Sequence, residues 1–248
     1  MGHDGGMLTA PDFLNHLDTS TRQFADLVAT GDLEAPVPSC PGWTFKDLVA
    51  HLGEVHQWAV HAIVAGNPDA QTIPEPSGQV ALAEWYRDAA AALVSTLQKS
   101  DPLAPAWAFG PKPRTTFFWF RRQAHETTIH LWDAATSQST IKPIDPVLAL
   151  DGIDEGATMF FPRQVRLGRT PPLEHTLALE SGPSRWVLTG DGIGPASATD
   201  APAEATISGP AEPLLLLLWG RTSLEDVRLT ASGDETAAHA VLNAAITP

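Results

Sequence analysis

The segment from Arg121 to Asp133, RRQAHETTIHLWD, concentrates side chains that can bind a metal ion. Glu126 and His130 are four residues apart, so at about 3.6 residues per turn they lie on one face of a helix and can share an ion. His125 and His130 are five residues apart and diverge by roughly 140°, which excludes the zincin pairing of two histidines four residues apart. We therefore predict that Glu126 and His130 are metal ligands and that His125 is not.

Two ligands on one helix leave most of a coordination shell empty, so a third ligand must come from a helix packed against it. The segment at 45–65 offers His51, His56 and His61. Its apolar stripe consists of Leu48, Val49, Leu52, Val55 and Ala59. His51 lies beside this stripe, whereas His56 and His61 fall nearer its edges, so we predict His51 as the third ligand.

This donor set, two imidazoles and one carboxylate, suits zinc, nickel, iron or cobalt better than magnesium or calcium, which prefer oxygen ligands. Three protein ligands also leave positions open for water or substrate. Packing is the alternative explanation, because an isolated helical histidine is usually a hydrogen-bonded core or surface residue. Nine histidines in the chain make chance pairs common.

Three further residues have both a functional and a structural interpretation. Cys40, in SCPGW, precedes a helix whose N-terminus could lower the pKa of its thiol. Its structural interpretation is that of a small apolar residue in a turn. Glu54 could support or rival His51 as a ligand, or lie on a solvated helix face. Arg221 follows LLLLLWG, where its guanidinium could bind a substrate carboxylate or satisfy the last carbonyls of a helix.

The first half of the chain predicts a four-helix bundle, because apolar residues recur there at intervals of three and four. Thr44 and Asp47 resemble a capping box at the start of the second helix, and the GNP at 66–68 ends it. The predicted helices begin near Pro11 and run from about Phe45 to Ala65, Val80 to Leu97 and Phe117 to Ala135.

The sequence changes in character near Lys142, and we place the domain boundary there, giving a bundle over 1–143 and a second domain over 144–248. The second domain mixes one helical pattern, Val147–Phe160, with strand patterns and is predicted to be α+β. Its other predicted elements are strands at His175–Leu179, Arg185–Leu188, Ala205–Ile207 and Val227–Thr230, and helices at Ala211–Trp219 and Glu235–Ile246.

Composition limits the partners and the location. The 29 acidic against 15 basic residues give a net charge of −14, which repels phosphate backbones and anionic lipids, so we expect neither nucleic acid nor membrane partners. The longest apolar stretch, Leu214–Trp219, is far below the ~20 residues that span a bilayer. MGHDGGM lacks a signal-peptide core, and one cysteine permits no intrachain disulfide, so we expect a cytoplasmic protein.

Three segments resemble the mycothiol-dependent maleylpyruvate isomerase family. CPGWTFKDLVAHLGE is similar to the family's turn and helix with its first metal histidine, here His51. HETTIHLWDA places Glu126 and His130 at the family's other ligand positions, and ISGPAEPLLLLLWGR resembles its C-terminal domain, with Arg221 as the arginine implicated in the active site. The resemblance covers nearly the whole chain and implies a DinB-like metal-binding bundle followed by a sterol-carrier-like α+β domain.

The resemblance also implies an activity. In this family a divalent metal, for which we expect zinc, holds the thiol of mycothiol as a thiolate that attacks a small electrophile, one that we expect to bear a carboxylate. Reversible addition to an activated cis double bond allows rotation and gives cis–trans isomerisation, whereas a thiolate that stays attached gives a thiol transferase. The alternatives are a small-molecule binding protein with a structural metal, suggested by eight tryptophans and no obvious general base, a purely structural protein, and an iron oxygenase.

Overall fold

The computed structural model describes residues 7–192 and 202–248. The chain forms two compact units, Leu8–Pro143 and Ile144–Pro248. The expectation that the N-terminus lacks a signal peptide concerns residues 1–7, of which 1–6 lie outside the described residues. In the part that the structure describes, no helix is both long and apolar enough to cross a bilayer.

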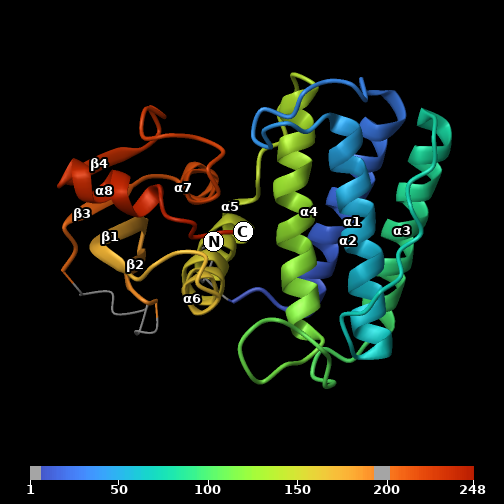
Figure 1. Ribbon diagram of the computed structural model, residues 1–248, viewed down its shortest axis with the longest axis horizontal. Coiled ribbons are helices and arrows are strands. Elements are labelled where there is room, and N and C mark those ends of the chain that lie inside the picture. Colours follow the sequence, from blue (N-terminus) through green and yellow to red (C-terminus); the bar gives the residue numbers. More distant parts are fainter. Residues whose placement is uncertain (1–6, 193–201) are drawn as a thin grey trace, which may run out of the picture. The chain divides into compact units, whose positions relative to one another are not determined.

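The first unit is the predicted four-helix bundle, whose long helices run alongside one another in Figure 1. The helices are α1 (Ala10–Thr30), α2 (Phe45–Ala65), α3 (Gln79–Lys99) and α4 (Phe117–Ser137). Helix α1 packs against α4 and α3, and α2 packs against α3 and α4. The pairs α1/α3 and α2/α4 therefore form opposite faces of the bundle.

Helix α2 begins and ends at the predicted residues because local sequence signals mark both of its ends. The Thr44 hydroxyl accepts the Asp47 backbone N–H at 3.3 Å, and the Asp47 carboxylate accepts the Thr44 backbone N–H at 2.8 Å, which completes the capping box. Gly66 ends the helix at a φ of 71°, a left-handed conformation that glycine adopts without strain. Between the two ends, Leu48 and Leu52 are fully buried in the bundle core.

Helices α2 and α3 approach closely at Gly53. A Cβ atom at this position would lie 2.2 Å from the ring of Trp85, so only glycine permits this packing. The Trp85 indole N–H donates to the Ile73 carbonyl at 3.0 Å, which ties the connection between the two helices to α3. The close contact holds the segment of α2 that carries His51 in place.

The prediction that His56 lies near the edge of the apolar stripe is wrong, because this side chain is completely buried. Its Nε2 lies 3.1 Å from the Thr127 hydroxyl on α4, and its ring centroid is 5.6 Å from that of Tyr86. An imidazole is tolerated in a core when another element supplies a polar partner. Burial lowers the pKa of His56 from its ordinary 6.5 to about 3, so it is neutral in the folded protein.

This burial makes stability depend on pH. Below about pH 6.5 the unfolded chain protonates His56 while the folded chain does not, so the free energy of unfolding falls by up to about 1.4 kcal/mol per pH unit down to about pH 3. We expect His56→Gln, which cannot titrate, to flatten this dependence. Urea unfolding of both proteins between about pH 7 and pH 4 measures it, and equal slopes would contradict the prediction.

The second unit is α+β, as predicted. Its elements are α5 (Pro146–Glu155), the π-helix η1 (Gly156–Phe160), α6 (Phe161–Arg166), β1 (Leu173–Ser181), β2 (Ser184–Gly190), β3 (Ala205–Ser208), α7 (Ala211–Leu218), β4 (Thr230–Gly233) and α8 (Glu235–Leu242). The strands form a mixed sheet in the order β2-β1-β3-β4. Strand β1 pairs antiparallel with β2 and parallel with β3, and β3 pairs antiparallel with β4.

Three predicted elements of this unit are wrong in extent. The helix at Glu235–Ile246 is too long, because α8 ends at Leu242 and Asn243 is its C-cap. The strand at Val227–Thr230 is shifted, because the Asp226 carboxylate accepts the Arg228 backbone N–H at 3.0 Å and makes a turn there, so β4 starts only at Thr230. The helix at Val147–Phe160 is α-helical in its first part only and widens into η1. Pro162 follows and has no N–H to donate back into that turn.

Candidate metal centre

The structure brings the three predicted ligands together on the α2/α4 face of the bundle. Oε1 of Glu126 lies 3.4 Å from Nε2 of His51 and 3.3 Å from Nε2 of His130. The three atoms lie within 4.8 Å of one another. The two imidazole rings meet edge to face, with centroids 5.1 Å apart. Residues from two helices that are distant in sequence thus converge on one oxygen atom.

These distances are longer than most hydrogen bonds in proteins and match the spacing of ligands around a metal ion. Hydrogen bonds from N–H to oxygen in proteins cluster at about 2.9 to 3.0 Å. Around a tetrahedral zinc ion with bonds of about 2.0 to 2.1 Å, neighbouring ligand atoms are about 3.3 Å apart. The two Nε2–Oε1 distances match this separation between ligand atoms, and the donor set leaves coordination positions for further ligands. The residues present therefore fit a divalent metal.

Arg122, one turn before Glu126 on α4, holds the other oxygen of that carboxylate. Its Nη2 donates to Oε2 at 2.9 Å, and its side chain is 3% exposed. Burial raises the pKa of Glu126, but hydrogen bonds from His130 and His51 and the charge of Arg122 hold it well below its ordinary value. Arg122 was not among the residues predicted from sequence, although its four-residue spacing from Glu126 was a usable signal.

Asp133 orients His130 from the far side. Its fully buried carboxylate accepts the His130 Nδ1–H at 2.9 Å, so Nε2 is the nitrogen that faces Glu126. The same carboxylate accepts the Ser39 hydroxyl, and the Cys40 sulfur lies 3.8 Å from it. Cys40, His130 and Asp133 thus form a second group of potential ligands, which this hydrogen bonding already explains. Asp133 was not predicted from sequence to have this role, although it lies only three residues after His130.

The electrostatics of this centre favour a cation. Burial lowers the pKa of His130, but hydrogen bonds to Asp133 and Glu126 and the charges of both carboxylates raise it more, to about 9. One fully buried carboxylate and one half-buried carboxylate flank the imidazole and thus stabilise a positive charge between them. A metal ion at Nε2 would supply that charge in place of the proton there.

The other candidates lie outside this centre. His125, predicted not to be a ligand, packs edge-on against Phe13 with centroids 5.9 Å apart. Glu54 is exposed, in agreement with a solvated helix face, and belongs to neither group of potential ligands found among the described residues. His61 forms a 2.9 Å hydrogen bond with Asn67 at the end of α2.

Arg221 lies in the second unit, just after α7. Its Nη1 donates to the Trp219 carbonyl at 2.8 Å, and its Cζ is 5.9 Å from the centroid of the Trp219 ring. This contact agrees with the structural alternative, in which the guanidinium satisfies a carbonyl at the helix end. Its role toward a substrate carboxylate stays a prediction.

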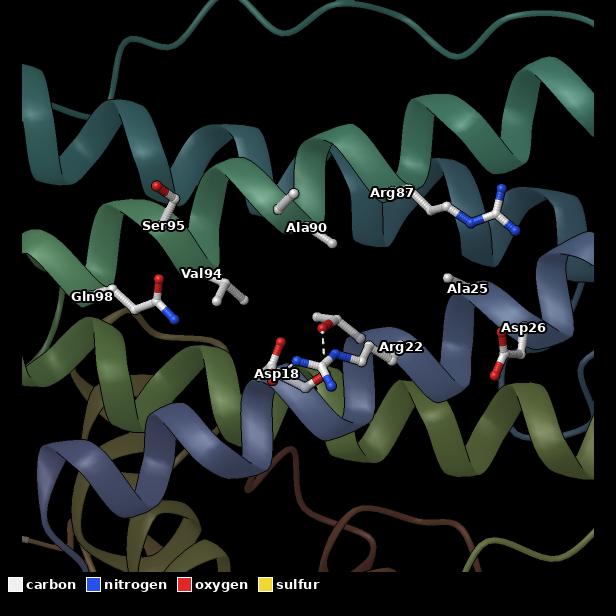
Figure 2. Close-up of a pocket in the computed structure, with 11 residues that line it drawn as sticks. Asp18, Arg22, Ala25, Asp26, Arg87, Ala90, Val94, Ser95 and Gln98 are labelled. Carbon is white, nitrogen blue, oxygen red and sulfur yellow. Dashed lines mark hydrogen bonds and ion pairs between the residues drawn. The ribbon is translucent and has the colours of Figure 1, made fainter.

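A separate groove of about 470 Å³ runs along the α1/α3 face of the bundle (Figure 2). Ala25, Ala90 and Val94 line it, as does Arg22, which forms an ion pair with Asp18. The groove includes none of the predicted ligands. It is therefore distinct from the candidate metal centre, which lies on the opposite face.

The fold and the site define a class of two-unit proteins in which a helical bundle with a potential metal centre precedes an α+β unit. Residues 14–135 match the family model described as the mycothiol maleylpyruvate isomerase N-terminal domain, and residues 147–240 match the MDMPI C-terminal domain. The chain belongs to the mycothiol-dependent maleylpyruvate isomerase family.

Two solved structures share this fold. One is described as the crystal structure of the mycothiol-dependent maleylpyruvate isomerase and the other as a histidine-to-alanine mutant of it. Each has 15% sequence identity and a TM-score of 0.61, and the alignment covers 92% of this chain and 95% of the other. A search of curated proteins found no match.

Proposed function

We propose that this protein is a metal-dependent enzyme that uses a thiol cofactor such as mycothiol to isomerise the activated cis double bond of a small electrophile. The observation that supports it most is the convergence of two imidazoles and one ionised carboxylate on a single point, with distances that suit zinc. Membership of the isomerase family supports the reaction type.

The chemistry needs a thiolate near neutral pH. A divalent metal would supply it, because a coordinated thiol is deprotonated. Such a thiolate would add to one alkene carbon while the alkene electron pair moves onto the conjugated carbonyl oxygen. Rotation about the resulting single bond and return of the electron pair, which expels the thiolate, would give the trans isomer. Of the protein's own residues, His51, Glu126 and His130 would hold the metal. Asp133 keeps the proton of His130 on Nδ1, so that Nε2 stays available.

Arg221 is proposed to bind a carboxylate of the substrate, since a guanidinium can donate two parallel hydrogen bonds to it. We expect Arg221→Lys, which loses this geometry, to raise the KM for a carboxylate substrate about tenfold or more, with unchanged metal content. Steady-state kinetics with the substrate and its methyl ester measure the effect. An equal loss with acid and ester would contradict the role.

The main alternative is a binding protein of the same fold, which the abundance of tryptophan suggests. Three of them anchor loops instead: the indole N–H groups of Trp58, Trp85 and Trp119 donate to backbone carbonyls. The acceptors are those of Pro68, Ile73 and Trp107, at 3.0, 3.0 and 2.7 Å. These contacts give three of the eight tryptophans a role in the fold, so the tryptophan count supports the binding alternative less than it did from sequence alone.

Proton NMR of a reaction mixture tests the proposal. The zinc-loaded protein is mixed with mycothiol and maleylpyruvate, a cis alkene activated by carbonyl groups. Appearance of the trans isomer with the thiol recovered is the expected result. Accumulation of a thioether would indicate a transferase, and bound but unchanged alkene a binding protein. Either outcome, confirmed with other activated cis alkenes, would overturn the isomerase proposal.

A further inference from the structure

The potential ligands on α4 are part of a longer row. Arg122, Glu126 and His130 follow one another at intervals of four residues, so their side chains stand on one face of the helix. Within the row, Glu126 presents Oε1 to the two histidines and Oε2 to Arg122. The two oxygens of one carboxylate thus have different partners.

This division bears on how Glu126 can bind a metal. A carboxylate coordinates through one oxygen or chelates through both, and chelation takes a second coordination position. Arg122 holds Oε2 in a charge-assisted hydrogen bond of 2.9 Å. Its guanidinium is almost fully buried, so water competes little for it. Turning Oε2 toward the ion would break this charge-assisted hydrogen bond to a buried guanidinium, which is costly.

We propose that Arg122 is a positioning residue, which keeps Glu126 a ligand through Oε1 alone and so preserves a metal position for a reactant. The inference rests on the proposed function, because it requires that the centre binds a metal. In this proposal Arg122 acts through Glu126 and does not contact the substrate.

Stabilisation of the fold explains the pair less well. A buried ion pair recovers little net energy after desolvation, and an apolar side chain of similar size commonly serves as well or better. The chain also contains a matched comparison, since Arg22 and Asp18 form an ion pair at the same four-residue spacing on α1. Arg22 is 75% exposed, and such pairs contribute little.

Cobalt(II) is the probe for the test, because its visible absorption is strong in four-coordinate sites and weaker in sites of higher coordination number. The parent, Arg122→Met, Arg122→Lys and the control Arg22→Met are titrated with cobalt. We expect both Arg122 variants to bind cobalt about 10- to 100-fold more weakly, with weaker absorption as Glu126 chelates. The control should match the parent.

Circular dichroism shows which variants are folded. If Arg122→Met unfolds, Arg122→Lys decides, because its ammonium keeps the charge but lacks the planar fork of the guanidinium. A folded Arg122 variant with the parent's spectrum and affinity would overturn the role of Arg122 and leave the proposed function standing. A parent that binds neither cobalt nor zinc would overturn both.

Discussion

Glu126→Gln is expected to abolish metal binding and turnover together. The amide oxygen is neutral, so it is a poor ligand in a centre where Glu126 supplies the only carboxylate among the three predicted ligands. We expect metal content to fall from about one ion per chain to near zero, and turnover to fall by more than the roughly 100-fold attributed to residues behind the ligands. Elemental analysis after gel filtration, with an isomerisation assay, measures both.

Glu54→Gln is the matched control, because it makes the same change at an exposed position on α2. It should retain the metal and the activity. Full turnover by Glu126→Gln would refute the proposed mechanism, and loss of turnover with the metal retained would show that Glu126 acts otherwise than as a ligand.

Asp133→Ala is expected to weaken both the fold and the metal centre. The substitution leaves the Nδ1–H of His130 and the hydroxyl of Ser39 without this buried acceptor, which should cost about 3 kcal/mol or more of stability. It also releases the ring of His130, and we expect zinc affinity to fall about 10- to 100-fold. Asp133→Asn, which keeps one acceptor oxygen, should give smaller losses.

Chemical denaturation and competition with a chelating dye measure the two losses separately. Asp26→Ala, an exposed position on α1, is the control for removing a carboxylate from the bundle. An Asp133→Ala protein with lower stability but the parent's zinc affinity would show that Asp133 serves the fold and does not orient His130.

The convergence of the three candidate ligands, which the structure bears out, could be predicted from sequence because the evidence for it is local. Glu126 and His130 share a helical face by spacing alone, and His51 lies beside an apolar stripe in a segment that resembles the family. Two supporting contacts were also local but were not predicted, since Arg122 precedes Glu126 by four residues and Asp133 follows His130 by three. The contacts between distant residues could not be predicted: Asp133 meets Ser39 across 94 positions, and His56 meets Thr127 across 71. Nothing in the sequence around these residues indicates such distant partners.

The same reasoning explains the errors in the second unit. The four bundle helices are long, so their apolar period is repeated often enough to be read. Strand β4 has four residues, all exposed, and its place is decided by pairing with β3. Val227, predicted to start that strand, is 97% exposed in the preceding turn. A β-branched residue such as Val227 indicates the start of a strand only weakly when the register depends on a partner strand.

The position of His51 on one helix and Glu126 on another gives a bound ion an influence on the whole bundle. These two residues are 75 positions apart, so an ion held by both would close a long loop and act as a reversible cross-link. Cross-links across long segments reduce the conformational entropy of the unfolded chain. The melting temperature should therefore rise with the concentration of available zinc, and chelators should act as denaturants of this unit.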